Sequence, residues 1–310
     1  MNPENKVVAI FGPTAVGKTE AAILAAEKVD AEIVSVDSRQ IYRGMDIGTA
    51  KPTAEQRARI PHHLIDVADP EHPWSLVDFN RAALAAIDAI HAHRRLPLLV
   101  GGTGQYFAAI LEGWQPPPNE SDLELRRELE AYAAEHGSRA LHEKLRKIDP
   151  LSAQRIDHRN VRRVVRAIEI CHISGRPASS LRRKEPPPFD VLRIGLTMPR
   201  KKLYARIDER IEAMIAQGFV QEVEKLFAKG LRPENSAMSA IGYRQIGEYL
   251  QGKTPLEQAV LQIRRLTRQF VRRQANWFKA DDPQIHWIDA GPDAGAEIVT
   301  LIKRWCTEDD

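Results

Sequence analysis

The chain has few of the residues, and none of the long apolar runs, that would point to a disulfide-rich, zinc-binding or membrane protein. Only two of its 310 residues are cysteines, Cys171 and Cys306, and neither has the nearby second cysteine that a disulfide framework or a structural zinc site needs. No apolar run approaches the roughly 18 residues of a membrane span, and the N-terminus lacks the basic flank and apolar stretch of a secretory signal. The sequence therefore predicts a cytoplasmic globular protein with no membrane partner.

Aromatic residues are also scarce, at 6% of the chain, but hydrophobic residues at 43% and charged residues at 28% suffice for a large core and a polar surface. The formal net charge is only +3, yet residues 190–280 hold 17 lysines and arginines against 9 acidic residues. This stretch predicts a local basic surface that would suit a polyanion. Composition alone does not identify the polyanion.

The hydrophobic pattern of the first hundred residues alternates between short β-branched runs and longer segments with helical spacing. Such alternation is typical of βαβ units that build a parallel sheet. Ser75 and Asp78 are plausible caps for one of the helices. Strands are predicted at 6–11, 32–36, 63–67 and 96–100, and helices at 19–29 and 78–93.

Three prolines at 116–118 interrupt this alternation, and the pattern that follows is helical throughout, with segments near 122–136, 138–147 and 160–174. After a second proline-rich break, a strand is predicted at 190–198, helices between 201 and 280, a strand at 285–288 and a helix at 297–305. We therefore predict an α/β fold. Its parallel sheet, with helices on both faces, is formed by residues 1–117 and 189–310, and residues 118–188 form an all-helical insertion domain.

The segment Gly12–Thr19, GPTAVGKT, matches the phosphate-binding pattern G-x-x-x-x-G-K-[ST] between a predicted strand and a predicted helix. Small residues let successive backbone N–H groups point at phosphate oxygens, and the positive end of the helix dipole faces the same anion. Lys18 adds a positive charge, and Thr19 is a predicted ligand of a Mg²⁺ ion that bridges two phosphates. The core is thus P-loop NTPase-like, and a diphosphate or nucleotide is predicted to bind Gly12, Pro13, Thr14, Ala15, Val16, Gly17, Lys18 and Thr19.

Two more polar side chains follow predicted strands and would point into the crevice where α/β sheets bind ligands. Asp37 comes directly after the strand at 32–36, and three roles stay open for it: a metal-linked carboxylate, a general base, or the N-cap of a following helix. Thr103 lies in the turn Gly101-Gly102-Thr103-Gly104. Its hydroxyl is available to a diphosphate or a base, although the same glycines would also suit a simple tight turn.

Seven motifs occur in order and span most of the chain: GPTAVGKT, VDSRQIYRGMDIGTAKP, PHHLID, VGGTGQY, NVRRVVRAIE, LYARIDERIEAMIAQG and SAIGYRQ. Together they closely resemble the motifs of bacterial-type tRNA dimethylallyltransferases, the IPP transferase family. Gln105, in the fourth motif, departs from the leucine that is common there, which affects the expected local packing.

This resemblance implies transfer of a dimethylallyl group from dimethylallyl diphosphate to N6 of the adenosine 3′ of the anticodon. The implied substrates are tRNAs that read codons beginning with U, and diphosphate is released. It also implies a helical insertion that swings and a channel that the adenine and the diphosphate enter from opposite ends. Asp37 matches the family's general base, and Lys18, Thr19 and Arg210 match its diphosphate-binding groups. Thr103 matches the threonine near the reacting centre. The expected partners are dimethylallyl diphosphate and the anticodon stem-loop of tRNA, and we expect a monomer.

Basic residues cluster in two places that would suit RNA. Arg159, Arg162, Arg163 and Arg166 are predicted to share one helix face, and a second cluster runs from Arg264 to Lys279 with aromatic residues interleaved. Solvated basic helices are the alternative. The family's tRNA-contacting stretches map onto Asp37, Ser38, Arg39 and Gln40, onto Arg162, Arg163, Val164, Val165 and Arg166, and onto Ser239, Ala240, Ile241, Gly242, Tyr243 and Arg244.

Some alternatives stay open. Arg206 and Arg210 lie on a predicted helix, where they could simply pair with Asp208, Glu209 or Glu212. A P-loop kinase of a small metabolite, with the insertion as its lid, is a second reading of the chain. A nucleotide-switched RNA-binding protein without transfer chemistry is a third.

Overall fold

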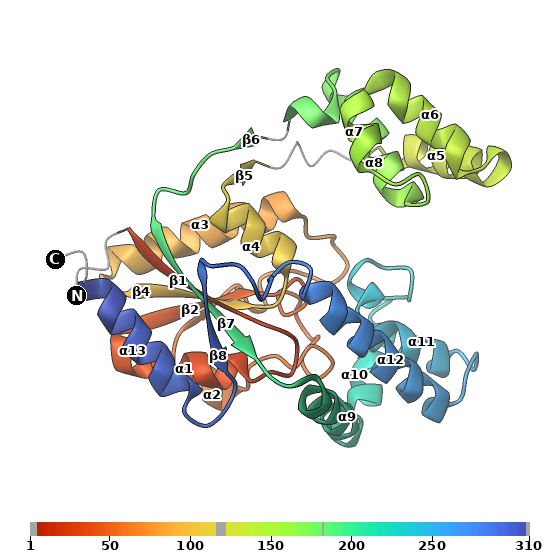
Figure 1. The fold of residues 1–310 in the computed structure, drawn as a ribbon. Helices are drawn as coiled ribbons and strands as arrows, with labels where there is room; N and C mark the ends of the chain where they lie inside the picture. Colours follow the sequence, from red (N-terminus) through yellow and green to blue (C-terminus); the bar gives the residue numbers. More distant parts are fainter. Residues whose placement is uncertain (1–4, 116–121, 182, 308–310) are drawn as a thin grey trace. The chain divides into compact units, whose positions relative to one another are not determined.

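The computed structural model describes residues 5–115, 122–181 and 183–307, which divide into two compact units (Figure 1). The core unit contains the described residues of 1–74, 81–107 and 188–310, and the helical unit contains those of 75–80 and 108–187. The described residues of the predicted insertion at 118–188 fall in the helical unit except for Pro188, and this unit also contains short segments that precede the insertion in the chain. None of the helices within the described ranges is both long and apolar enough to cross a bilayer.

The core unit is built on a six-stranded sheet in which every pairing is parallel. All side chains of β1, β2 and β4 are buried, as expected for a parallel sheet that is covered on both faces. The strand order is β3-β2-β4-β1-β7-β8. The strands are β1 (Lys6–Phe11), β2 (Ala31–Val36), β3 (His62–His63), β4 (Leu96–Gly101), β7 (Asp190–Thr197) and β8 (Ile285–Asp289).

Helices cover both faces of this sheet (Figure 1). One face carries α1 (Lys18–Val29) packed against α13 (Ala294–Thr307), and α3 (Leu76–Ala92) runs along the other. Both predicted caps of α3 are present: the Asp78 N–H donates to the Ser75 hydroxyl, and the Ser75 N–H donates to the Asp78 carboxylate, each at 3.1 Å. The remaining helices near this sheet are α2 (Ala54–Arg59) and α4 (Gly104–Leu111).

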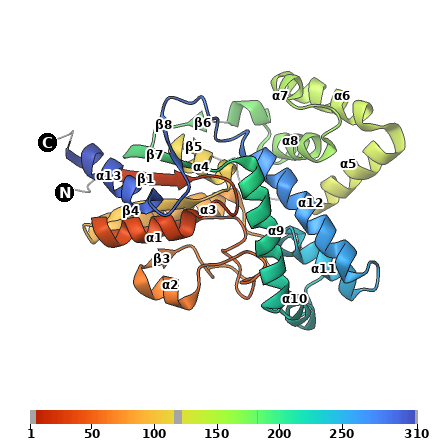
Figure 2. The same ribbon diagram turned by 60° about the horizontal axis from the view of Figure 1, so that its bottom comes forward.

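The predicted helical stretch between 201 and 280 forms four helices at one side of the core unit (Figure 2). Gly218 separates the first two with a φ of +99°, a conformation that glycine adopts readily. The first helix buries Leu203, Ile207 and Ile211, which recur at every fourth residue. The last helix ends at Gln274, six residues before the predicted limit. The four are α9 (Arg200–Ala216), α10 (Phe219–Ala228), α11 (Tyr243–Leu250) and α12 (Leu256–Gln274), with a 3₁₀ turn η2 (Ala237–Ser239) before α11.

The strand predicted at 63–67 is wrong, because β3 contains only His62–His63. Leu64 and Asp66 have φ values of +60° and +57°, which take the chain out of the extended conformation. The Asp66 carboxylate accepts a hydrogen bond from the buried ammonium group of Lys51, 2.6 Å away, and this contact holds the turn. The apolar residues of this segment suggested a strand, and the contact between Lys51 and Asp66 could not be predicted from them.

The helical unit has its own small core, which includes Leu141, Leu145 and Val164. Three of its helices match the predicted segments, and the fourth, α7, was not predicted. Its start nevertheless has a clear signal, because Pro150 occupies the first turn and the Asp149 carboxylate accepts from the Ser152 N–H at 3.0 Å. The elements are β5 (Trp114–Gln115), α5 (Leu123–His136), α6 (Ser138–Ile148), α7 (Pro150–Arg155), α8 (Val161–Ser174), η1 (Ala178–Leu181) and β6 (Arg183–Lys184).

Candidate active site

The strand order brings three predicted motifs to one edge of the sheet. Strands β2, β4 and β1 are neighbours and parallel, so the segments that follow their carboxyl ends lie side by side. These segments are the Asp37 turn, the Gly101–Gly104 turn and the phosphate loop at 12–19. Each motif was recognisable in the sequence, but their adjacency follows from the order of the strands.

The phosphate loop has the backbone that its sequence predicts. Gly17 has a φ of +106°, and α1 begins at Lys18 directly after it. The Lys18 ammonium group donates to the carbonyl oxygens of Gly12 and Pro13, at 3.0 and 2.8 Å, and so lies across the loop. The side chain of Val16 is buried, which leaves its backbone as the part that could face a ligand.

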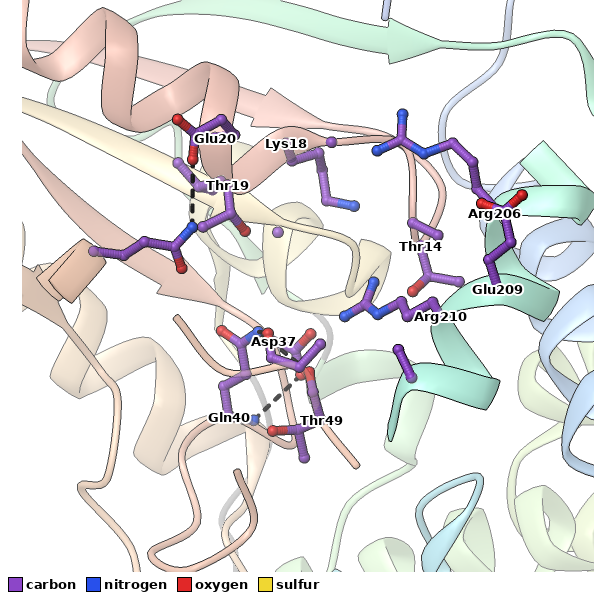
Figure 3. A pocket seen from close by; sticks show the side chains of 17 residues that line it. Thr14, Lys18, Thr19, Glu20, Asp37, Gln40, Thr49, Arg206, Glu209 and Arg210 are labelled. Atoms are coloured by element: carbon purple, nitrogen blue, oxygen red, sulfur yellow. Dashed lines mark hydrogen bonds between the residues drawn. The ribbon is translucent and has the colours of Figure 1, made fainter. Parts of the chain in front are cut away.

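A cavity of about 570 Å³ opens above this loop within the core unit. In Figure 3 the side chains of Lys18, Asp37 and Arg210 point toward its centre, and those of Thr14 and Thr19 lie along its wall. The cavity is lined by Thr14, Ala15, Gly17, Lys18, Thr19, Glu20, Asp37, Gln40, Thr49, Ala50, Gln56, Val100, Gly101, Arg206, Glu209, Arg210 and Ala213.

The cavity concentrates positive charge. Burial, together with the smaller effect of repulsion from Arg210, lowers the pKa of Lys18 to about 7, and attraction to Asp37 acts in the opposite direction. Burial also lowers the pKa of Arg210, with Asp37 again acting in the opposite direction and Arg206 adding repulsion. An anion placed between these cations would relieve their repulsion and favour their charged forms.

The arginines of α9 do not pair with the acids of their own helix. Asp208 and Glu212 form ion pairs with Arg268 and Arg264 of α12 instead, and these contacts join the two helices. Within the described chain, Arg206 and Arg210 make no ion pair. The alternative in which they simply pair with Asp208, Glu209 or Glu212 is therefore wrong, and both arginines line the cavity.

Asp37 is half-buried and follows the last residue of β2. One carboxylate oxygen accepts hydrogen bonds from the backbone N–H groups of Arg39 and Gln40, at 2.8 and 3.4 Å, so it stabilises a turn. No helix begins directly after Asp37, so the prediction that it could cap a helix is wrong. The carboxylate still lines the cavity opposite Lys18 and Arg210.

The Gly101–Gly104 turn adjoins both the Asp37 turn and the phosphate loop. The Thr103 hydroxyl oxygen accepts a hydrogen bond from the Ser38 N–H at 3.2 Å, which ties this turn to the residue after Asp37. The Gly102 carbonyl accepts from the side chain of Gln274 at 2.9 Å. Gln274 was not among the predicted site residues, because it lies in a basic helical run with no motif around it.

Two of the stretches predicted to contact RNA meet in the core unit. The Arg39 guanidinium donates to the Ser236 carbonyl oxygen at 2.9 Å and to the Ser239 hydroxyl at 3.2 Å, which joins the segment at 37–40 to the one at 239–244. Ser239 and Arg244 are exposed, whereas Ala240, Gly242 and Tyr243 are buried. The Tyr243 hydroxyl donates to Glu222 at 2.5 Å, so this side chain has a structural role.

The third stretch, in the helical unit, presents fewer side chains than predicted. Arg162 and Arg163 are exposed, but Val164 and Val165 pack in the core. The Arg166 guanidinium pairs with the fully buried carboxylate of Glu169, which also pairs with Arg126. Helix α8 begins only at Val161, and Arg159 lies before it and pairs with Asp157 at 2.6 Å. The predicted ridge of four arginines on one helix face is therefore wrong for Arg159.

The second basic cluster is partly engaged in the fold. Arg264 and Arg268 are paired with α9, and Phe278 stacks on Phe11 with ring centroids 4.3 Å apart. Other basic and aromatic members of the cluster are exposed. They are Arg265, Arg272, Arg273, Trp277 and Lys279.

A metal would find few protein ligands here. No cluster of three or more histidine, cysteine or carboxylate side chains suited to a metal occurs in the described part of the chain. Thr19 lines the cavity next to the phosphate loop and offers one hydroxyl. Since Mg²⁺ commonly keeps several waters and binds mainly to substrate phosphates, this sparse set of donors fits Mg²⁺ that arrives with a diphosphate.

Two family models match the chain. The model described as IPP transferase matches residues 40–281, and the one described as isopentenyl transferase matches residues 5–65. Together they cover both the phosphate loop and the helices that complete the cavity.

Curated proteins and solved structures agree with these models. A tRNA dimethylallyltransferase of Thermomicrobium roseum is 49% identical over 93% of this chain and 88% of its own length. The full-length tRNA isopentenylpyrophosphate transferase of Bacillus halodurans superposes with a TM-score of 0.73, at 41% identity over 98% of this chain and 97% of that one. A eukaryotic dimethylallyltransferase that acts on tRNA gives a TM-score of 0.78, at 27% identity over 96% of this chain and 78% of that one.

Proposed function

The chain belongs to the IPP transferase family, and from this premise we propose that it transfers a dimethylallyl group from dimethylallyl diphosphate to N6 of an adenosine in tRNA. The adenosine is the one 3′ of the anticodon in tRNAs that read codons beginning with U, and diphosphate is the other product. The observation that carries the proposal is the cavity itself, where Asp37 faces the cations Lys18 and Arg210 above a phosphate loop.

The leaving group would occupy the positive side of this cavity. As the nitrogen attacks the allylic carbon, the carbon–oxygen bond breaks and its electron pair stays on the departing diphosphate. Lys18, Arg210 and the N–H groups of the phosphate loop stabilise that developing negative charge, an effect that is larger where water is excluded. Arg206 adds charge at the rim, since its guanidinium lies beside Gly17.

Asp37 would act on the nucleophile, which is the exocyclic amino group of the adenosine. An exocyclic amino group must lose a proton when its nitrogen forms a new bond, and the Asp37 carboxylate is placed in the cavity to accept that proton. Its hydrogen bonds with the Arg39 and Gln40 N–H groups occupy one oxygen and fix the orientation of the other. Thr103 supports this geometry through Ser38, so it would act as a positioning residue.

Mg²⁺ is the proposed cofactor, held by the Thr19 hydroxyl together with the diphosphate. When bound, it would add a further positive charge to the leaving group. The remaining positive charge of the site comes from the side chains described above.

The proposed macromolecular partner is the anticodon stem-loop of tRNA. Exposed basic side chains at Arg162, Arg163 and Arg244 would contact phosphates, and the exposed indole of Trp277 would suit an unstacked base. We also propose that the protein works in the cytoplasm as a monomer and that the helical unit moves as RNA binds.

The decisive experiment incubates the purified protein with dimethylallyl diphosphate, Mg²⁺ and a synthetic anticodon stem-loop. Mass analysis of the RNA should show the gain of one dimethylallyl group on the adenosine 3′ of the anticodon. A parallel incubation with ATP and a pool of small metabolites tests the kinase reading. Phosphorylated metabolites with unmodified RNA would contradict the proposal.

A further inference from the structure

One buried side chain connects the two halves of the proposed site. Gln274 is the last residue of α12, and only 4% of it is exposed. Its amide oxygen accepts a hydrogen bond from the Thr14 N–H at 2.9 Å, and its amide nitrogen donates to the Gly102 carbonyl at 2.9 Å. A single side chain thus bridges the phosphate loop and the glycine turn, which lie 260 and 172 residues away from it in the sequence.

Each end of this bridge leads to a group with a proposed role. Thr14 belongs to the loop that would hold the diphosphate, and it lines the cavity. Gly102 directly precedes Thr103, whose hydroxyl accepts from the Ser38 N–H beside Asp37. The path from Thr14 through Gln274 to Asp37 therefore links the cradle of the leaving group to the group that would accept the proton.

The chemistry of the bridge suits glutamine in particular. A primary amide offers a donor and an acceptor on one flat group, so it satisfies an N–H and a carbonyl at once. Both partners are backbone groups of turns that would otherwise lack these hydrogen bonds. Gly102 also leaves the necessary room, because a Cβ at that position would lie 2.3 Å from the Gln274 amide nitrogen.

We propose that Gln274 is a positioning residue for the transfer reaction, which fixes the distance between the phosphate loop and the Asp37 turn. It acts through Thr14 and Gly102 and does not itself contact the reacting atoms. This inference rests on the proposed function. It adds Gln274 to the residues proposed to support the reaction, which otherwise come from the phosphate loop, the Asp37 turn and the arginines of α9.

The test replaces Gln274 with methionine, which has a similar length but neither polar group. We expect kcat to fall by about tenfold or more, because small misplacements of reacting groups carry large costs. The KM for the stem-loop should stay within about twofold of the wild-type value, since Gln274 is buried and offers almost no surface for contact with RNA. Calorimetry with inorganic pyrophosphate should show binding weakened by about threefold or more, since Thr14 loses its anchor.

A double variant separates positioning from general loss of stability. If Gln274 acts through the glycine turn, then adding Gln274→Met to Thr103→Ala should lower kcat far less than it does in the wild-type protein. If the fall in kcat of the double variant equals the product of the falls in the two single variants, the proposal is overturned. A single Gln274→Met variant with near wild-type kcat would also overturn it. Ile298→Val, in the buried face of α13, is the control that lowers stability without touching either turn.

A second variant and a binding measurement test the same contact if Gln274→Met does not fold or the wild-type protein is inactive. If Gln274→Met does not fold, Gly102→Ala disturbs the same contact from its other partner and should give the same pattern. A wild-type protein that leaves RNA unmodified would refute the proposed function, while the pyrophosphate comparison would still report on the bridge. Equal pyrophosphate affinity and equal kcat in both proteins would refute the role of Gln274 alone.

Discussion

At the scale of single residues, the cavity separates the two charges that a transfer reaction needs to manage. Lys18 and Arg210 would hold the anion that leaves, and Asp37 would take the proton that the nucleophile loses. Two acids of α9, Asp208 and Glu212, do not neutralise these arginines, because they are paired with Arg268 and Arg264 of α12. The paired acids thus leave the α9 arginines free for phosphate.

The substitution Asp37→Asn should slow the transfer reaction strongly. The amide keeps the shape of the carboxylate but accepts protons poorly, so we expect kcat to fall by about 10²- to 10⁴-fold. Single-turnover kinetics with the stem-loop would measure this loss, and calorimetry should show pyrophosphate affinity unchanged or higher, since a negative charge is removed from the cavity.

Glu20→Gln is the matched control for this variant, because Glu20 is a second carboxylate on the wall of the same cavity. It forms hydrogen bonds with Gln56 and Arg59 and should leave kcat within about twofold of the wild-type value. Full turnover by Asp37→Asn, or an equal loss in both variants, would show that Asp37 is not the proton acceptor.

At the scale of elements, α8 shows how one basic stretch divides between folding and binding. Its buried carboxylate, Glu169, is held by Arg166 and Arg126 and accepts from the Asp122 N–H at 2.9 Å. Arg162 and Arg163 are exposed on the same helix. Sequence spacing alone placed Arg166 in one RNA-binding ridge with Arg162 and Arg163, because it does not show which arginine faces a buried acid.

The arginines of α8 should therefore respond differently to substitution. Arg166→Ala should destabilise the helical unit by about 2 kcal/mol, because it leaves a buried carboxylate with fewer partners. The double variant Arg162→Ala with Arg163→Ala should leave thermal stability unchanged, weaken stem-loop binding and flatten its salt dependence. Thermal melts and binding titrations at several salt concentrations would measure both effects.

Pyrophosphate binding provides the control, since it should be the same in the double variant and in the wild-type protein. Unchanged RNA affinity in that variant would remove α8 from the proposed interface. Unchanged stability in Arg166→Ala would mean that Arg126 and the Asp122 N–H suffice for Glu169.

At the scale of the whole molecule, each unit has its own core and its own buried acids. The helical unit encloses Asp149 and Glu169, both fully buried. Burial alone would raise their pKa values, but hydrogen bonds from Ser152 and Ser179 to Asp149, and from Arg126 and Arg166 to Glu169, hold both below the ordinary range. The core unit has Glu32 in a comparable state, within a much larger core.

Acid should therefore open the helical unit first. A carboxyl group with a lowered pKa in the folded state stabilises the fold above its unfolded pKa, and this stabilisation is lost as the pH falls below about 4. Hydrogen exchange, corrected for its intrinsic pH dependence, should show α5 and α8 losing protection at a higher pH than β1 and β4. Glu169→Gln should reduce this pH dependence, and earlier loss of protection in the core strands would contradict the expectation.

The sequence predicted those parts of the fold that local patterns encode. The parallel sheet, the family and the phosphate loop followed from short-range signals, and comparison with known proteins confirmed the fold and the family. The site residues themselves remain predictions. Contacts between distant segments could not be predicted, among them the Lys51 anchor that ends β3, the pairing of α9 with α12, and the Gln274 bridge. Each of these depends on which polar groups meet after the strands are ordered.

The position of β1 in the sheet has a consequence for synthesis on the ribosome. Its neighbour β7 begins only at Asp190, and the amide of Gln274 comes later still. A nascent chain thus exposes one open edge of its most buried strand until well over half of the protein has been translated. The site can therefore be completed only late in translation, and a product truncated before β7 would carry the phosphate loop without an assembled site.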